Sequence, residues 1–186
     1  HELLGRLSAG SNVDARDAVG RTALHYAAGY GDRPAALALI RHGATVDAPD
    51  RLGVTPLHWA CPMDALESVK ALVAAGTKVE ALDRDKRTPL HWAADRGAEA
   101  CLKYLLEHTD APVDAADYGG FTALHSAARR GLVDSIKLLL SKGASLELAA
   151  LSGEVPLDLA VDPEAKKALA PPSGIASPAM KRKRSL

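Results

Sequence analysis

The chain has 186 residues, of which 47% are hydrophobic and 25% are charged, so it is long enough and apolar enough to bury a core. Four of the 23 basic residues and none of the 23 acidic residues lie in 171–186, so residues 1–170 carry a net charge of −4, which argues against a general polyanion-binding protein. The two cysteines are too few for a disulfide framework, and no apolar run approaches the roughly 18 residues of a membrane helix.

A four-residue motif recurs along the chain. Its copies begin at Thr22, Thr55, Thr88 and Thr122, which are 33, 33 and 34 residues apart, and they read Thr-Ala-Leu-His or Thr-Pro-Leu-His. A degenerate copy begins 33 residues after the fourth, at Val155. Self-similarity at such a period indicates a stacked repeat protein, in which each unit buries its apolar faces against its neighbours.

Each motif predicts the start of a short helix, because threonine is a good N-cap and a proline at the first helical position loses no hydrogen bond. Paired aliphatic residues follow, such as Leu72-Val73 and Leu139-Leu140, and predict a second helix with a buried stripe. Glycine ends this helix, as at Gly76. The polar segment that follows, with its glycine and aspartate, predicts a turn or hairpin before the next motif.

At these residues the chain resembles the ankyrin-repeat family, over about residues 1–165. The resemblance implies an all-α solenoid of stacked helix-turn-helix pairs with β-hairpin or finger loops. It also implies that the histidine of each motif ties its turn to a neighbouring unit through hydrogen bonds. The expected organisation is a truncated repeat at 1–16, four repeats at 17–49, 50–82, 83–116 and 117–149, a degenerate capping repeat at 150–170 and a flexible basic tail at 171–186.

Two segments depart from the pattern. The apolar segment 3–7 looks like a second helix without a first, so we expect the natural protein to continue upstream of His1. In the second repeat, Pro62 should end the first helix early. Asp64 with Glu67 resembles a capping box that would start the next helix.

Neither a metal site nor catalysis is expected. His58 and Cys61 have the spacing of two zinc ligands on a helix, but a structural zinc site needs four and no second pair is near. There is no phosphate-binding glycine loop and no nucleophile elbow. The acids at the start of each unit recur in phase at the predicted turns, which makes them turn formers. The sequence therefore predicts a protein that needs no cofactor and is not an enzyme.

The resemblance also implies a binding face, because ankyrin arrays bind partners along a concave groove of loop tips and the outer side of the first helices. Six of the seven aromatic residues fall at these positions, as do seven arginines, and these residue types dominate binding hot spots. The predicted protein-binding residues are Tyr26, Tyr30, Arg51, Leu52, Trp59, Met63, Arg84, Arg87, Trp92, Arg96, Tyr118, Phe121, Arg129 and Arg130.

Two interpretations stay open for Tyr26, Trp59 and Trp92, which are either binding anchors or large residues that pack between repeats. Tyr118 and Phe121, at a predicted hairpin, have less reason to belong to a core. The expected partner is another protein, in the form of an extended acidic and aromatic peptide or surface across repeats two to four. Its carboxylates would meet the arginines through charge-assisted hydrogen bonds.

The segment Lys181-Arg182-Lys183-Arg184 resembles a nuclear import signal, with a solubilising tail as the alternative. Nucleic acid is expected to bind only nonspecifically, through this tail, and to be released by salt. Apolar surroundings of both cysteines suit free thiols in a reducing compartment, so the expected location is intracellular, cytoplasmic or nuclear. Three roles stay open: an adaptor, a fixed structural subunit of a large assembly, and a regulatory segment of a longer protein.

Overall fold

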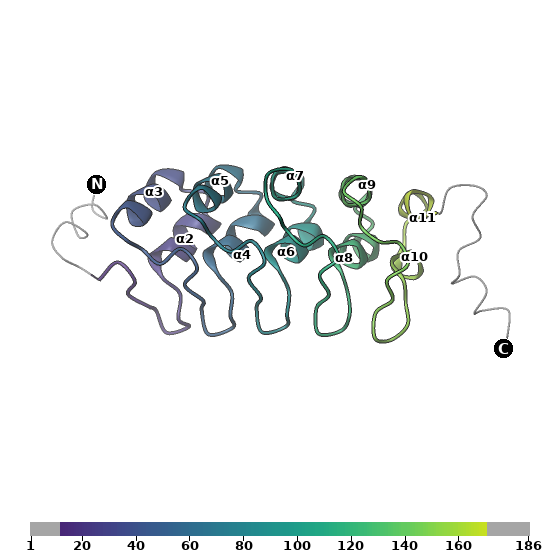
Figure 1. The fold of residues 1–186 in the computed structure, drawn as a ribbon, viewed down its shortest axis with the longest axis horizontal. Coiled ribbons are helices and arrows are strands. Elements are labelled where there is room, and N and C mark those ends of the chain that lie inside the picture. Colours follow the sequence, from purple (N-terminus) through teal and green to yellow (C-terminus); the bar gives the residue numbers. More distant parts are fainter. Residues whose placement is uncertain (1–11, 171–186) are drawn as a thin grey trace.

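The computed structural model describes residues 12–170, and the expectations for segment 3–7 and for Lys181, Arg182, Lys183 and Arg184 lie outside this range. The described chain forms two rows of helices, with the first helix of each unit in one row and the second helix in the other (Figure 1). Loops project from the row of first helices, away from the second row (Figure 1). This arrangement confirms the prediction of an all-α solenoid.

Each unit contributes one helix to each row. The first helices are α2 (Ala23–Gly29), α4 (Pro56–Ala60), α6 (Pro89–Arg96), α8 (Ala123–Arg130) and α10 (Pro156–Leu159). The second helices are α3 (Arg33–Arg41), α5 (Leu66–Ala74), α7 (Glu99–His108), α9 (Val133–Ser141) and α11 (Pro163–Leu169). As predicted, the threonine of each of the four full motifs is the N-cap of its first helix. None of the helices in residues 12–170 is both long and apolar enough to cross a bilayer.

The core is built from leucine and alanine. Leu57 and Leu124 from the motifs and Leu72 and Leu105 from the second helices are fully buried. Small residues such as Ala28 are also fully buried and let the two rows of helices approach closely. All seven aromatic residues lie within 12–170, and none of them belongs to this fully buried core. The stack is therefore held together by aliphatic side chains, which leaves the aromatic residues for its surface.

The second repeat confirms one prediction and corrects another. Helix α4 ends at Ala60 and continues as a short 3₁₀ helix, η1 (Cys61–Met63), as expected from Pro62. The predicted capping box of Asp64 with Glu67 is wrong, because the N-cap of α5 is Ala65 and makes no side-chain cap bond. Asp64 instead has φ +52° and its carboxylate accepts the backbone N–H of Cys101, 2.9 Å away, in the next repeat.

The loops reverse direction as hairpins do, but no residue from 12 to 170 lies in a strand, so the β-hairpins are not observed. The first loop is closed by the N–H of Asp17, which donates to the carbonyl of Arg21 over 2.9 Å. Neighbouring loops are joined in turn, since the N–H of Arg51 donates to the carbonyl of Val19 over 3.0 Å. These contacts hold the loops side by side along one edge of the stack.

Ser68 in α5 and Ser135 in α9 have buried hydroxyl groups without a hydrogen-bond partner among the residues described. An unpaired buried hydroxyl destabilises a fold by about 1–3 kcal/mol. We expect Ser68→Ala and Ser135→Ala each to raise the free energy of unfolding by about 1 kcal/mol, measured by urea denaturation. A loss of stability in both variants would show that these hydroxyls have partners in solution.

Candidate protein-binding site

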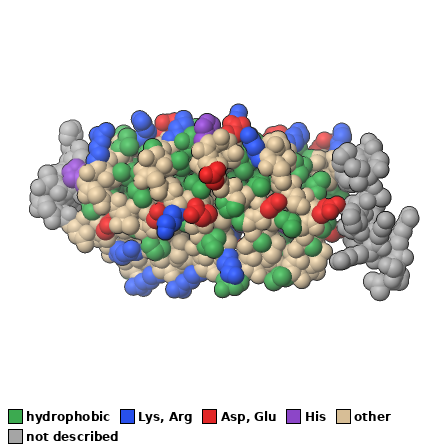
Figure 2. All heavy atoms as spheres, viewed as in Figure 1, with side chains coloured by type: hydrophobic (Ala, Val, Ile, Leu, Met, Phe, Trp, Pro, Cys, Tyr) green, Lys and Arg blue, Asp and Glu red, His purple; other side chains and the backbone are tan. Residues whose placement is uncertain are grey.

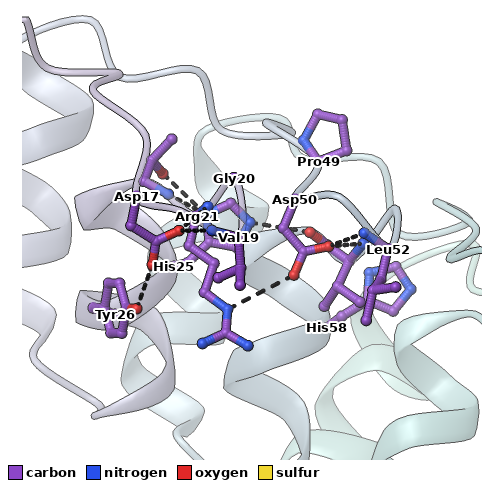
Figure 3. A network of polar contacts seen from close by, with 12 residues as sticks. Asp17, Val19, Gly20, Arg21, His25, Tyr26, Pro49, Asp50, Leu52 and His58 are labelled. Atoms are coloured by element: carbon purple, nitrogen blue, oxygen red, sulfur yellow. Dashed lines mark hydrogen bonds and ion pairs between the residues drawn. The ribbon is translucent and has the colours of Figure 1, made fainter.

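Each loop is shaped by the aspartate at its base. Oδ1 of Asp17 accepts the backbone N–H groups of Val19 and Arg21, both over 2.9 Å (Figure 3). The same pair of bonds is made by Asp50, Asp83 and Asp117. The geometry agrees with the prediction that these acids form turns. It also leaves the second oxygen, Oδ2, outside the turn, and in Asp17, Asp50 and Asp83 this oxygen contacts a side chain.

The motif histidines link each unit to the next. Nδ1 of His91 accepts the N–H of Thr88 over 3.1 Å, and its Nε2 lies 3.1 Å from the carbonyl of Phe121 in the following repeat. Because Nδ1 accepts, Nε2 carries the proton and donates it. Equivalent contacts are made by His25, His58 and His125. The expected structural role of these histidines is confirmed.

Burial sets the protonation of these four histidines. Desolvation lowers the pKa of His58 and His91, and the hydrogen bond to the next repeat's carbonyl opposes this only in part. The same causes lower the pKa of His25 and His125. Both ring nitrogens are engaged in the neutral form, so no lone pair is left for a metal ion. Within residues 12–170 there is also no cluster of three or more metal-ligating side chains.

One position of the first helices carries a column of aromatic rings. Tyr26 in α2, Trp59 in α4 and Trp92 in α6 each lie four residues after the motif threonine and are partly buried. The hydroxyl of Tyr26 donates to Oδ2 of Asp17 over 2.6 Å, and this bond is the main reason why the pKa of Asp17 is lowered. Nε1 of Trp92 donates to Oδ2 of Asp83 over 2.9 Å. The rings thus brace the loops and still expose part of their surface, which fits both interpretations left open by the sequence.

Basic side chains lie over several of these rings. The guanidinium carbon of Arg21 is 4.3 Å from the centre of the Trp59 ring, which belongs to the next repeat. Arg87 lies 5.5 Å from the Trp92 ring. Such cation–π contacts stabilise by about 0.5–1 kcal/mol at exposed sites. They fix the guanidinium groups next to the aromatic column.

Two of the predicted binding arginines are paired within the chain. Arg130 lies 3.1 Å from Oδ2 of Asp95 and Arg129 lies 3.4 Å from Oδ1, so both reach across to the preceding repeat. Partial burial raises the pKa of Asp95, but the hydrogen bond and charge of Arg130, with the charges of Arg87 and Arg129, outweigh it and lower this pKa overall. These arginines are therefore less available to a partner than the sequence suggested.

Three other arginines are exposed and have no ion pair or side-chain hydrogen bond to any residue in 12–170: Arg51, Arg84 and Arg96. Two of them lie on loops, and Figure 2 shows basic side chains along the lower edge, where the loops end. An unpaired guanidinium offers five donors to a carboxylate without first breaking an internal contact. This edge is the most available cationic part of the predicted site.

A pocket of about 80 Å³ opens beside the fourth repeat. It is lined by Arg87, Asp117, Phe121, His125, Ser126, Arg129 and Leu159. Pockets for small-molecule ligands usually measure roughly 300–1,000 Å³, so this one suits a single side chain of a larger partner.

Comparison with protein families finds a match to ankyrin repeats (3 copies) over residues 1–83 and 65–150, which together cover most of the chain. The chain belongs to the ankyrin-repeat family. Ankyrin repeats are generally protein–protein interaction modules. A comparison with curated proteins found no match.

All fourteen residues predicted to bind a partner lie on the loops, on the first helices or on η1 of the ankyrin repeats, and none is fully buried. Those that are exposed are Tyr30, Arg51, Leu52, Met63, Arg84, Arg96, Tyr118, Arg129 and Arg130. Those that are half-buried are Tyr26, Trp59, Arg87, Trp92 and Phe121. Sequence reasoning missed Asp117 and Leu159 as part of a pocket. The replacement of the aromatic residue by Ser126 at this position of the repeat is the sequence signal that could have revealed them.

Proposed function

We propose that this ankyrin-repeat chain is a non-catalytic adaptor that binds an extended, acidic and aromatic segment of a partner protein along repeats two to four. We also propose that it works inside the cell, in the cytoplasm or nucleus. The observation that carries the proposal is the column of half-exposed rings in α2, α4 and α6, which is bordered by loop arginines without internal partners.

Apolar contact area is available on the same side of the stack. Tyr30 is 82% exposed, and Met63 and Tyr118 are each 63% exposed. Exposed apolar residues are unremarkable one at a time, but a surface that combines several of them with aromatic rings and arginine has the composition of a binding hot spot. We expect the partner's apolar side chains to pack against these groups and against the parts of Trp59 and Trp92 that Arg21 and Arg87 leave exposed.

Charge favours an acidic partner. Residues 1–170 carry a net negative charge, yet Arg51, Arg84 and Arg96 are concentrated on the loop and first-helix side without acidic partners of their own. A carboxylate that meets an unpaired guanidinium forms a charge-assisted hydrogen bond, roughly twice as strong as a neutral one. The net negative charge of residues 1–170 as a whole would favour a basic partner. We give more weight to the unpaired arginines, because they lie at the proposed site itself.

Replacing these three arginines tests the proposal. We expect Arg51→Ala, Arg84→Ala and Arg96→Ala together to weaken partner binding by at least tenfold, about 1.4 kcal/mol, with an unchanged melting temperature. The partners are first captured from cell lysate by the wild-type chain, and the affinity of the main partner is then measured by titration calorimetry.

The matched control replaces three exposed basic residues of the second helices, Arg41, Lys103 and Lys166, by alanine. These residues also lack ion pairs within the described part of the chain, and the change removes the same charge. The control should bind as the wild type does. Equal weakening in both triple variants would mean that only net charge matters, and the groove proposal would then fail.

The capture experiment also separates an adaptor from a fixed subunit. An adaptor yields partners that exchange with added unlabelled chain, whereas a subunit yields one stoichiometric complex that does not exchange.

A further inference from the structure

The aromatic column ends abruptly at the fourth repeat. The residue four positions after the motif threonine is Tyr26, Trp59 or Trp92 in the first three repeats, but it is Ser126 in α8. The equivalent residue of the next unit is Leu159 in α10. The pocket of about 80 Å³ lies where these two positions meet. It therefore occupies the place where a fourth ring of the column would stand.

The first and third repeats show what such a ring does. In both, a ring donor binds Oδ2 of the loop aspartate nine residues earlier, over 2.6 Å from Tyr26 and over 2.9 Å from Trp92. In the fourth repeat Asp117 makes both of its turn-forming bonds through Oδ1, over 2.8 and 2.9 Å. Its Oδ2 accepts no hydrogen bond from any residue between 12 and 170. The acceptor for a ring donor is present, while the ring is missing.

A cation for stacking is also in place. Arg21, directly before the first motif, lies over the Trp59 ring of the following repeat at 4.3 Å. Arg87 stands at the equivalent position before the third motif. Its guanidinium lies 5.5 Å from the Trp92 ring of its own repeat, and it also lines the pocket of the following repeat. The phenyl ring of Phe121 forms another wall. The pocket thus holds an acceptor, the guanidinium groups of Arg87 and Arg129, the second of them paired with Asp95, and an aromatic wall around a space that fits one side chain.

From this arrangement we infer that the pocket receives a tyrosine or tryptophan side chain of the partner protein. The ring donates its O–H or N–H to Oδ2 of Asp117, packs against Phe121 and Leu159 and stacks under Arg87, so that the partner completes the column. A carboxylate could meet Arg87 but would lie against the charge of Asp117 and could not donate to its Oδ2, and a plain phenyl ring would also leave Oδ2 without a donor. The inference rests on the proposed function and specifies which type of side chain in the partner the fourth repeat binds.

The probe for this site is 4-methylphenol, which corresponds to the side chain of tyrosine. Toluene is the control compound, because it has the same ring and methyl group but no O–H donor. We expect millimolar 4-methylphenol to shift the backbone amide NMR signals of Arg87, Phe121 and Ser126 in the full chain. Toluene should bind about five- to tenfold more weakly, since it cannot form the hydrogen bond to Asp117.

Two variants make the test specific. Ser126→Tyr fills the pocket with a ring of the chain's own and should abolish the response while keeping the melting temperature at or above that of the wild type. Asp117→Asn keeps an oxygen for the two turn bonds but replaces the free acceptor by an NH₂ group. It should weaken 4-methylphenol binding and leave toluene binding unchanged, with the fold preserved, because the phenol then loses its charge-assisted bond and keeps at most a neutral one.

The inference is overturned if 4-methylphenol leaves these amides unshifted, or if it shifts them equally in the wild type and in both variants. This result does not depend on the arginine experiment. A chain that binds its partner through Arg51, Arg84 and Arg96 but shows no response here would retain the proposed function and lose only the aromatic pocket.

Discussion

Lowering the pH from 7.5 to 5.5 should reduce the free energy of unfolding by about 2–5 kcal/mol. The cause is the set of four motif histidines, whose pKa values in the folded chain are all lowered by burial from the ordinary value of 6.5. Each of them donates one proton to the next repeat and accepts the N–H of its own motif threonine, so a second ring proton on Nδ1 would break that N–H bond and place a charge in a buried site.

The sign follows from the direction of these shifts. With a folded-state pKa below 6.5, the unfolded chain binds more protons than the folded chain in the range beneath 6.5, so stability is complete above that pH and is lost as the pH falls through it. One histidine contributes at most about 1.3 kcal/mol between pH 7.5 and 5.5. The lowered carboxyl pKa values of Asp17, Glu67 and Asp95 act only at lower pH, because their ordinary values are 3.8 to 4.5.

The measurement is urea denaturation at pH 7.5, 6.5 and 5.5, followed by circular dichroism. His91→Gln serves as the control, because it removes one titrating group. The variant should be less stable at pH 7.5, but its stability should fall by about a quarter less on acidification. A wild-type chain whose stability is flat over this range would contradict the assignment of four buried neutral rings.

The fold was predictable because its determinants are local and repeated. The threonine N-caps, the helix-starting prolines and the glycines after the second helices each act within a few residues of the chain, and the period of 33 places them in register. The error at Asp64 has the opposite origin. Its pattern with Glu67 fits a capping box, but a left-handed turn sends its carboxylate to the N–H of Cys101 in the next repeat, a contact that no local pattern reveals.

The predicted binding site shows the same difference between local features, which the sequence predicts, and contacts between repeats, which it does not. Periodicity placed the fourteen residues on the loop and first-helix side of the stack, since position within the repeat decides the side. It did not reveal which guanidinium groups are available. Arg129 and Arg130 are paired with Asp95, whereas Arg84 and Arg96 are unpaired within residues 12–170, and both outcomes depend on contacts between different repeats. The pocket at Ser126 likewise requires loops and helices of three repeats to meet.

A methyl group at Gly120 should separate the fourth loop from the fifth. Gly120 has φ +79°, and a Cβ there would lie 2.9 Å from the backbone nitrogen of Leu151 and 3.2 Å from Cα of Ala150. Backbone atoms at that distance must move, and their movement strains the bond from the N–H of Leu151 to the carbonyl of Gly119, which measures 2.8 Å. We expect Gly120→Ala to lower the free energy of unfolding by about 2–3 kcal/mol, measured by urea denaturation.

Gly143→Ala is the control that separates the effect of the close contact between the loops from the effect of backbone strain. Gly143 ends α9 with φ +84°, and a Cβ there would meet nothing within 4 Å, so only the left-handed conformation is penalised, by about 1 kcal/mol. Lys86 occupies the position of Gly120 in the third loop, with φ +59°, which shows that a loop can carry a side chain here when its conformation adjusts. The loss of stability in Gly120→Ala should arise from the separation of the fourth and fifth loops, which the bond from Leu151 to Gly119 joins. Equal losses in the two variants would mean that the close approach between loops contributes nothing to the stack.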